Sequence, residues 1–550
     1  MFPIPAVDLR SEFYWTSGAD GVLRLQGCED CGGIVHPPSA ACHRCRGSRL
    51  VPRPVSGKGT VVAVTVNHQA WQPDLPVPYA IAVVAIAEDP SVRLTARVVG
   101  ADPESVQIGQ QVSVSFERRA EVWIPVVTAV PGEIDAELPV VEETPEQVRL
   151  AVRAPATARR YEHASVISGI GNSRLGRRLM VDPLSLAVDA CRAAVADAGL
   201  TFADIDGLAT YPGGGVGNGF SEGGLTAVEE ALRLRPVWYA GGAELPGPGG
   251  SVVAAMLAVA AGLCRHVLCF RTVWEATYAE LLRTGRRRPP AGDPIGGPMT
   301  YTAPSGSFSA ANTLALGASH YLHRFGASRE TLGWIALNAR ANAALHPDAI
   351  YRTPLTMDDY LGARTVSSPF GLYDCDVPCD GSIAVVVSAA ETAPDLPHPA
   401  IRFEAAGTQI VERVSWDQST LTHEPQVLGP AMHLWTRTDL RPADVDLALL
   451  YDGFTFNCLS WLEALGFCGI GEAPGFLDGG KRIARDGELP LNTHGGQLSH
   501  GRTHGFGLLQ EAVTQLRHEA GQRQVAGAEV AVVSSGGLTP ASALLLVRDR

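Results

Sequence analysis

The hydrophobic pattern of the chain changes near residue 130. Between residues 51 and 130, short runs rich in Val, Ile and Thr alternate with Pro and Gly, as in GTVVAVTVNHQAW, YAIAVVAIAE and QQVSVSFER. About five such runs predict the strands of a small β-barrel. From about residue 161, helical and strand-like segments alternate, which favours a layered α/β architecture. Residues 131–160 are mixed in character and predict a linker, with a helix around residues 146–152.

The α/β region repeats its alternation in two halves. The first contains a predicted strand SVISGIG, an amphipathic helix LSLAVDACRAAVADAGL, and a buried helix and strand in GGSVVAAMLAVAAGLCRHVLCF. It closes on the apolar run DGSIAVVVSAAE, and VDLALLYDGF and VAVVSSGG predict strands of the second half. We therefore expect domains at residues 1–50, 51–130 and 161–550, the last divided into halves 161–395 and 396–550.

A Gly-rich hinge within residues 489–517 joins an extended run to an amphipathic helix. The hinge contains His494, His500, Arg502 and His504, with Gly495 and Gly496 at its turn. Glycines permit backbone geometries and close approaches that other residues resist, so polar groups of the hinge can reach a ligand. Two interpretations stay open: a ligand site, or a plain strand–turn–helix joint with solvated histidines.

Composition narrows the possible functions. The chain has 550 residues, of which 46% are hydrophobic and 18% charged, so large cores can form. A net charge of −13 gives no support to nucleic-acid binding, which favours a basic patch. No apolar run reaches the ~18 residues of a membrane span, and the start lacks the basic and apolar segments of a signal peptide. We expect a cytoplasmic protein without a membrane span.

Four of the eleven cysteines form two CxxC pairs. Cys28 and Cys31 make the first pair, and Cys42 and Cys45 the second. Two such knuckles can present four thiolates tetrahedrally, which suits Zn²⁺. This use of cysteine also indicates a reducing compartment. A closed site leaves no position for substrate, so we expect the zinc to be structural; four reduced structural cysteines are the alternative.

Residues 10–130 resemble a known module. The segments LQGCEDCGGIVHPP, CHRC and GKGTVVAVTVNH are similar to the zinc-ribbon plus OB-fold proteins that accompany thiolase-like enzymes. The resemblance implies a module that docks on an acyl-CoA enzyme and helps to shape its acyl or CoA channel.

The rest of the chain resembles the thiolase superfamily. The matching segments are DCDVPCDGSIAVVVSAAE, YDGFTFN, NTHGGQLSHGRTHG and VVSSGG. The resemblance implies two stacked βαβ-rich halves with buried central helices, normally in a homodimer. The whole chain is thus expected to be multidomain, with an N-terminal zinc ribbon and OB-fold β-barrel followed by an α/β thiolase fold.

Three catalytic positions depart from the thiolase pattern. The helix start AELPGPGG lacks the nucleophilic cysteine, which the N–H groups of a helix N-terminus would activate. The late Gly-rich turn reads Ser534, Ser535, Gly536, Gly537 where thiolases carry a second cysteine, and Arg502 replaces the histidine of their GHP element. Acyl transfer through a cysteine is therefore not expected.

The remaining pattern resembles the lipid-transfer-type thiolases, in particular the aldolases of steroid side-chain degradation. This resemblance implies retro-aldol cleavage of a β-hydroxyacyl thioester, carried by CoA or an acyl-carrier protein, into a ketone or aldehyde and a shorter acyl-CoA. Two other functions stay open: a cysteine-independent acyltransferase or Claisen-type enzyme on β-keto thioesters, and a non-catalytic acyl-CoA or lipid-binding scaffold.

Retro-aldol cleavage requires a base for the β-hydroxyl and donors for the enolate oxygen. Tyr451, in YDGF, is the first candidate for base or acid, and its phenol (pKa ~10) would need positive charge from Arg502 or a histidine. The aldolases' second tyrosine falls close to Arg502. His500 and His504 are therefore candidates for the missing acid/base or the thioester donor, and Asp452 for orienting a neighbour. The positions expected against the bound thioester are Gly495, Gly496, Gly536 and Gly537.

Overall fold

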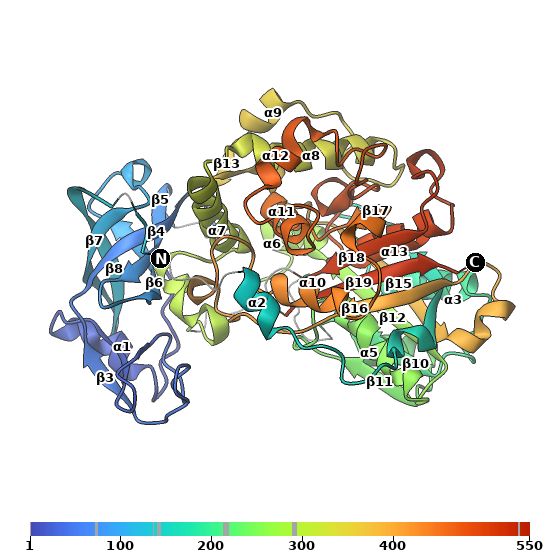
Figure 1. Cartoon of the computed structure of the whole chain (residues 1–550), viewed down its shortest axis with the longest axis horizontal. Coiled ribbons are helices and arrows are strands. Elements are labelled where there is room, and N and C mark those ends of the chain that lie inside the picture. The colour runs from blue at the N-terminus through green and yellow to red at the C-terminus, as the bar shows by residue number, and fades with distance from the viewer. Residues whose placement is uncertain are drawn as a thin grey trace.

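The chain folds around three β-sheets. The structure is a computed structural model and describes residues 2–71, 75–135, 137–139, 145–212, 219–288, 294–536 and 540–549. Among these residues the sheets have three, seven and nine strands. Figure 1 shows the first two at the blue N-terminal side of the molecule, and the third beyond helix α7 (Ala310–Phe325).

The N-terminal unit is a helical lead-in and a small ribbon. Helix α1 (Glu12–Thr16) buries Tyr14 and Trp15 against the barrel. Strand β1 (Arg24–Cys28) lies between β2 (Ile34–Val35) and β3 (Leu50–Pro54) and is antiparallel to both. Both loops that carry the CxxC pairs therefore project from one short sheet.

The five predicted strands close into the barrel. They are β4 (Lys58–Asn67), β5 (Tyr79–Ile86), β6 (Asp89–Val99), β7 (Gln110–Arg119) and β8 (Val122–Ile134). Their order is β4-β5-β6-β8-β7, and pairing of β4 with β7 completes the ring. The expected OB-fold barrel is confirmed.

The α/β region adds two strands to this sheet. They are β13 (Thr365–Ser367), which pairs with β4, and β14 (Phe370–Gly371). Across the junction the hydroxyls of Thr65 and Ser367 lie 2.7 Å apart, and both residues are fully buried. The barrel is therefore docked on the α/β region through buried hydrogen bonds.

The nine-stranded sheet holds both halves of the α/β region. Its order is β11 (Trp238–Gly241), β10 (Gly207–Thr210), β12 (His266–Trp274), β15 (Asp380–Ala389), β9 (Ser165–Asn172), β16 (Ile401–Gly407), β19 (Ser542–Arg548), β18 (Val530–Ser535) and β17 (Leu447–Leu449). The halves meet where β9 pairs with β16, with Ile167 opposite Ile401.

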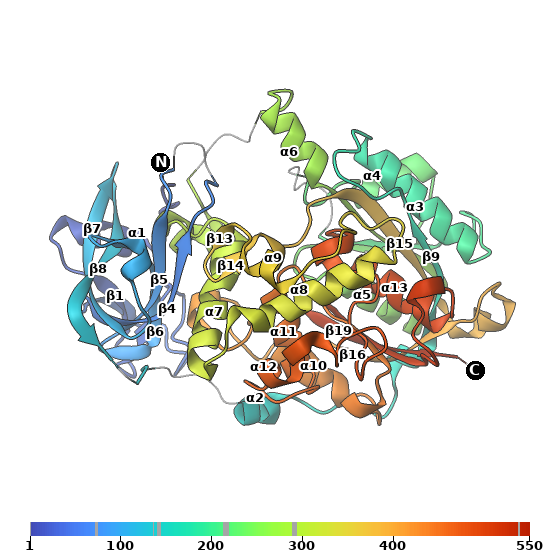
Figure 2. The same cartoon turned by 90° about the horizontal axis from the view of Figure 1, so that it is seen from above.

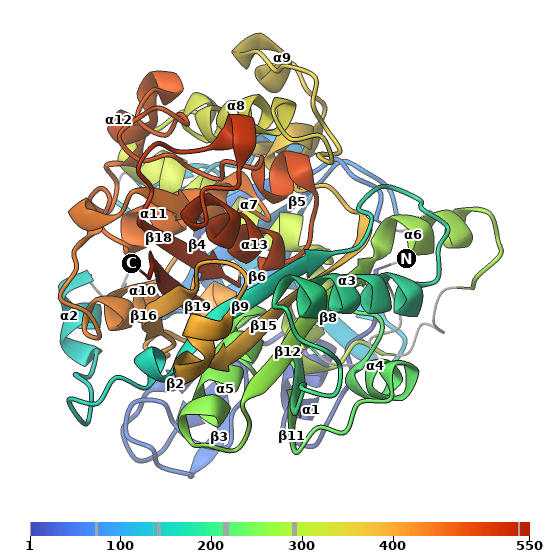
Figure 3. The same cartoon turned by 90° about the vertical axis from the view of Figure 1, so that its right-hand side faces the viewer.

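Two central helices pack between the halves. Helix α5 (Gly249–Ala260) contacts β10, β12 and β15 of the first half and β19 of the second. Helix α13 (Phe506–Leu516) contacts β9 and β15 on one side and β17 and β18 on the other. Small residues such as Ala255 and Ala512 are fully buried there and let the strands approach closely. The stacked thiolase-like halves with buried central helices are confirmed; α13 and β9 can be followed in Figure 3.

The other helices pack around the two halves, and α11 (Thr455–Ala464) is buried along its whole length. The first half carries α3 (Pro183–Asp197), α4 (Leu225–Leu232) and α6 (Glu275–Arg283). The helices packed around the second half are α8 (Arg329–Ala344), α9 (Met357–Leu361), α10 (Leu428–Trp435), α11 and α12 (Ala473–Leu477). Helix α2 (Pro145–Ala151) contacts α10. Figure 2 shows α7 between the barrel and the rest of the α/β region. Among the described residues no helix has the length and apolarity needed to span a membrane.

Candidate active site

A cavity of about 130 Å³ lies where the hinge meets helices α5, α7 and α11. Three predicted catalytic residues, Tyr451, Arg502 and His504, line this Tyr451 cavity together, and so does Gly536. Gly537 lies outside the described residues. The described lining residues are Tyr211, Phe220, Pro248, Ala310, Leu314, Asp376, Tyr451, Gly453, Phe454, Asn457, Arg502, His504 and Gly536.

Tyr451 reaches the cavity because it follows the carboxyl end of strand β17. Its backbone N–H donates to Oγ of Ser534 at 2.8 Å, at the end of the neighbouring parallel strand β18. Burial raises the pKa of the phenol, and the negative charge of Asp376 adds to this effect, while Arg502 opposes it. The phenol is therefore protonated at neutral pH, which favours the acid over the base among the two roles considered for Tyr451.

Arg502 is held between two carboxylates. Its Nε donates to Oε2 of Glu275 at 2.6 Å, and its Nη1 donates to Oδ1 of Asp376 at 2.9 Å. Burial by itself lowers the pKa of Arg502, but the two carboxylates outweigh it and raise the pKa. Because its charge is shared with both carboxylates, Arg502 offers little positive charge to Tyr451.

Asp376 is a site residue that the motifs did not single out. It enters the cavity just before strand β15, and its backbone N–H donates to the carbonyl oxygen of Gly453 at 3.0 Å. Burial raises the pKa of its carboxyl to about 7, with Arg502 acting in the opposite direction. A carboxyl that titrates near neutral pH suits a general base. The available signal was DCDVPCDG, where two aspartates precede a buried strand and a third begins it.

His504 is fixed by an arginine behind the cavity wall. Its Nδ1 lies 2.7 Å from Nη2 of Arg271, and its ring centroid lies 4.4 Å from that of Phe220. Burial, with the positive charges of Arg271 and Arg502, lowers the pKa of the imidazole well below its usual value. His504 is therefore neutral at physiological pH.

Asp452 and the hinge glycines lie behind the cavity rather than in it. Oδ1 of Asp452 accepts from the backbone N–H of Gln497 at 2.8 Å, at the start of the π-helical turn Gly496–His500. Gly496 has φ +58°, and a Cβ there would lie 1.8 Å from Oδ2 of Asp452. A Cβ at Gly495 would lie 2.5 Å from Cβ of Ala343. The two glycines thus permit a close approach within the hinge, and they do not line the Tyr451 cavity.

His500 points into a different cavity, of about 250 Å³, which we call the three-histidine cavity. His346, His494 and His500 all line it, and the ring centroid of His500 lies 4.5 Å from that of His346 and 4.9 Å from that of His494. Burial lowers the pKa of each of these imidazoles. The structure therefore does not bring His500 to Tyr451, and the hinge histidines divide between two cavities.

The two positions where thiolases carry cysteine meet beside the Tyr451 cavity. The backbone N–H of Gly249, at the start of α5, donates to Oγ of Ser535 at 2.8 Å. No cysteine is among the described residues that line the cavity. Burial raises the pKa of the nearby Cys375 and Cys379 well above the usual value. The helix terminus that would activate a thiolate here binds a serine hydroxyl.

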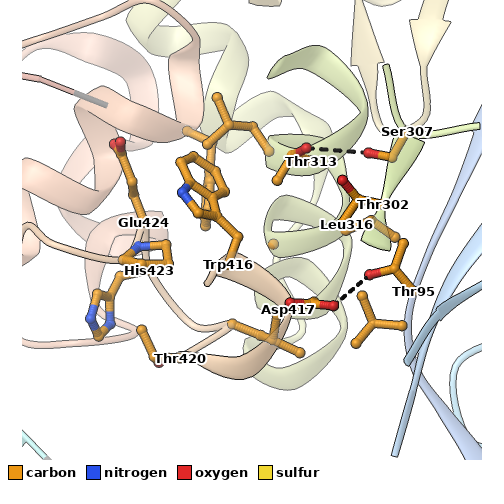
Figure 4. Close-up of a pocket in the computed structure, with 16 residues that line it drawn as sticks. Thr95, Thr302, Ser307, Thr313, Leu316, Trp416, Asp417, Thr420, His423 and Glu424 are labelled. Atoms are coloured by element: carbon orange, nitrogen blue, oxygen red, sulfur yellow. Dashed lines mark hydrogen bonds between the residues drawn. The ribbon is translucent and has the colours of Figure 1, made fainter. Parts of the chain in front are cut away.

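A third cavity, which is mainly apolar, lies at the junction with the barrel (Figure 4). Strands β5 and β6 contribute Val83 and Thr95, and Thr95 donates to Asp417 at 3.0 Å. Leu314 of helix α7 lines this cavity and also the Tyr451 cavity. The barrel therefore lies one side chain away from the candidate active site.

The four predicted metal ligands converge at one point. The sulfurs of Cys28, Cys31, Cys42 and Cys45 all lie within 4.8 Å of one another. Two sulfur pairs, Cys28 with Cys45 and Cys31 with Cys42, are separated by 3.6 Å. Zn–S bonds of ~2.3 Å in a tetrahedron place sulfurs about 3.8 Å apart. The donor set fits zinc, and no open coordination position faces a substrate.

Three protein families match successive parts of the chain. Residues 15–51 match the rubredoxin-like zinc ribbon domain of ChsH2, residues 52–117 its C-terminal OB-fold domain, and residues 427–550 the thiolase C-terminal domain-like family. These matches agree with the ribbon, the barrel and the second half of the α/β region.

This chain covers two named relatives nearly end to end. The steroid side-chain-cleaving aldolase of Thermomonospora curvata is 35% identical over 395 residues, covering 70% of this chain and 98% of the relative. The 17-hydroxy-3-oxo-4-pregnene-20-carboxyl-CoA lyase of Mycobacterium tuberculosis is 34% identical over 391 residues, with the same coverage. The solved Ltp2-ChsH2(DUF35) aldolase aligns with a TM-score of 0.61 and 31% identity, over 70% of this chain and 98% of that chain. The protein therefore belongs to the thiolase-like family of the steroid side-chain-cleaving aldolases and carries the zinc-ribbon and OB-fold module in the same chain.

Proposed function

We propose that this protein is an acyl-CoA carbon–carbon lyase that cleaves a β-hydroxyacyl thioester by a retro-aldol reaction without a cysteine nucleophile. The observation that carries the proposal is the Tyr451 cavity. It combines a carboxyl that titrates near neutral pH, a protonated phenol and a neutral imidazole, with no cysteine in its described lining. Membership of the aldolase family supports the same reaction.

The residues divide the proton transfers between them. The carboxylate of Asp376 takes the proton of the β-hydroxyl, and the oxygen's electrons form the new carbonyl as the Cα–Cβ bond breaks. The bonding electrons move to the thioester as an enolate, whose oxygen accepts a hydrogen bond from His504. Tyr451 then protonates Cα, and the proton that Asp376 took from the β-hydroxyl returns through solvent to the Tyr451 phenolate, so that both residues regain their starting protonation states. The products are a ketone or aldehyde and the shortened acyl-CoA, so atoms and charges balance.

Arg502 holds the base in place. Its bond to Oδ1 of Asp376 opposes the effect of burial on the carboxyl, which keeps the base partly ionised at neutral pH. The second carboxylate, Glu275, fixes the other side of the guanidinium. This arrangement gives Arg502 a role different from the thiolase histidine whose place it takes.

We further propose a homodimer formed through the edge of the nine-stranded sheet. Strand β11 lies at one end of the strand order; Val237, just before it, is 72% exposed, and Tyr239, within it, is 66% exposed. An exposed apolar edge strand favours pairing with a second chain, and a two-fold axis would pair two copies of β11. Analytical ultracentrifugation tests this: we expect a dimer in the wild type and a shift toward monomer in Tyr239→Lys.

The reducing compartment expected from the cysteines remains part of the proposal. All eleven cysteines are free thiols in the structure, and four of them are the zinc ligands. A cytoplasmic setting keeps both the four zinc ligands and the other cysteines reduced.

Incubation of purified protein with a β-hydroxyacyl-CoA tests the reaction. The first substrate is a steroid thioester of the type for which the Mycobacterium tuberculosis relative is named, with the matching acyl-carrier-protein thioester beside it. Mass spectrometry should detect the carbonyl product and a shortened acyl-CoA. Reaction only with a second acyl donor would instead show an acyltransferase, and no turnover across several acyl classes would leave a binding scaffold.

Tyr451→Phe tests the assignment of the acid. Removing the hydroxyl should lower kcat by roughly 10²-fold, the usual contribution of a positioned acid. Tyr351→Phe is the matched control, because its hydroxyl accepts a bond from Arg177 away from the cavity. Undiminished cleavage in folded Tyr451→Phe would remove this residue from the mechanism.

A further inference from the structure

Arg271 is a buried arginine, and no carboxylate of the described residues forms a hydrogen bond with its guanidinium. It lies on strand β12 and is 1% exposed. Its Nη1 donates to the carbonyl oxygen of Tyr211 at 2.7 Å, and its Nη2 to the carbonyl oxygen of Phe220 at 2.8 Å. The same Nη2 lies 2.7 Å from Nδ1 of His504. Two backbone carbonyls thus fix the plane of the guanidinium and aim one edge at the imidazole.

This contact determines which nitrogen of His504 carries the proton. A guanidinium has only donors, so Nδ1 must accept the bond and carries no hydrogen. A neutral imidazole has one N–H, which is therefore on Nε2. The ring cannot turn freely, because it packs on Phe220 and its backbone has φ +51°. The position of the proton follows from the geometry alone.

The Nε2 atom faces the cavity. His504 lines the Tyr451 cavity, and Nε2 has no hydrogen-bond partner among the described residues. Nε2 is also not one of the polar atoms that are both fully buried and without a hydrogen-bond partner. The polar group that His504 offers to a ligand is thus an N–H donor.

The charge of Arg271 persists at the pH at which the enzyme would work. Burial lowers the pKa of its guanidinium to about 10, which leaves it protonated near neutrality. Its positive charge lies directly behind the imidazole, so a proton cannot add to Nδ1 without displacing the arginine. His504 is thereby excluded as a proton shuttle.

We propose that Arg271 is a positioning residue that holds His504 as the Nε2–H tautomer, a permanent donor to the oxygen that gains negative charge on the substrate thioester. The inference rests on the proposed lyase function for the identity of that oxygen. It narrows the chemistry at His504 from donor or acid/base to donor only, and it assigns a role to a strand residue far from the hinge in sequence.

Neutron crystallography of the wild-type protein tests the tautomer without any reaction. At neutral pD we expect deuterium on Nε2 of His504, none on Nδ1, and a fully deuterated guanidinium at Arg271. Deuterium on Nδ1 would overturn the proposal. If the map shows Nε2–D while no thioester is cleaved, the arrangement stands and the lyase assignment fails, so the two failures are distinguishable.

Kinetics test whether the donor acts in the transition state. His504→Ala should lower kcat by about 10²- to 10³-fold, as loss of an oxyanion donor does, and leave KM little changed. His504→Gln keeps an N–H donor and should recover at least part of kcat, with the pH profile of the wild type. A pH profile that loses one limb in His504→Gln would show acid/base catalysis and contradict the proposal.

Arg271→Met tests the positioning role. It keeps an unbranched apolar side chain but removes the donors, so Nδ1 is free to carry the proton, and we expect kcat to fall roughly 10-fold or more with KM near the wild-type value. Arg340→Met is the matched control, because Arg340 is also buried in the hinge region and bonds Ser499 and the carbonyl of Thr353 away from the cavity. Equal kcat in the two folded variants would overturn the role of Arg271.

Discussion

The Tyr451 cavity and the three-histidine cavity are both lined by residues of one hinge, yet their polar groups are held very differently. In the Tyr451 cavity, Arg502 bonds two carboxylates and His504 is oriented by Arg271. In the three-histidine cavity, Nδ1 of both His494 and His500 is buried without a hydrogen-bond partner among the described residues. The three-histidine cavity also contains a charged pair, Arg523 with Glu511, but that pair leaves Nδ1 of both histidines without a partner among the described residues.

The difference shows that a histidine-rich segment does not define a catalytic site by itself. The π-helical turn Gly496–His500, closed against Asp452, turns the chain so that His500 faces one cavity and His504 the other. A neutral imidazole without an oriented partner has no fixed direction for a proton. We therefore expect substitutions in the Tyr451 cavity to affect turnover and those in the three-histidine cavity to leave it nearly intact.

Asp376→Asn should produce the largest effect. The amide keeps the size of the side chain and an oxygen for Arg502, but it cannot take a proton, so kcat should fall by 10²-fold or more. Asp348→Asn, which changes an aspartate lining the three-histidine cavity, is the matched control. Steady-state kinetics with thermal melting checks both variants, and a folded Asp376→Asn enzyme with near wild-type kcat would contradict the assignment of the base.

The pH dependence follows from the same carboxyl. Burial raises the pKa of Asp376 to about 7, and only its ionised form accepts a proton. The kcat/KM of the wild type should therefore rise with pH, with a midpoint near 7, and level off above it. Asp452 also has a pKa raised by burial to about 7 but does not line the cavity. Persistence of the acid limb in Asp376→Asn would assign it to another group.

Arg502→Gln should have a smaller effect, which depends on pH. Arg502 lowers the pKa of Asp376 in opposition to burial, so its removal raises that pKa further. The acid limb should move to higher pH, with activity depressed at pH 7 and partly restored in more alkaline buffer. Arg523→Gln removes the arginine paired with Glu511 beside the three-histidine cavity and is the control. An unmoved acid limb in Arg502→Gln would separate Arg502 from the base.

Features encoded locally could be predicted from the sequence. The zinc ligands are two short CxxC pairs, and the structure brings all four sulfurs together. The barrel and the stacked halves follow from strand-like runs and buried helices that are continuous in the chain. Arg502 is visible as a departure from the thiolase pattern for the same reason: it occurs within a contiguous motif.

The pairing of charged groups could not be predicted, because it depends on contacts between distant segments. Arg502 bonds Asp376 and Glu275, which are 126 and 227 residues away. Arg271 lies 233 residues from His504. Without these partners, Arg502 looks like a free cation able to lower the pKa of Tyr451, whereas burial and the negative charge of Asp376 raise it. The direction of a pKa shift can be predicted only when the burial of the group and all its charged neighbours are known.

His494→Gln and His500→Gln should have the smallest effects and are the strictest test of the comparison. Both positions lie in the same motif as Arg502 and His504, so a catalytic role for the hinge as a whole would predict large losses. Neither imidazole lines the Tyr451 cavity, and glutamine retains most of the buried volume. We expect kcat/KM within about threefold of the wild type, because no proton transfer or oxyanion contact is removed. A loss comparable to that of His504→Ala would show that the two cavities act as one site and would overturn the separation on which the mechanism depends.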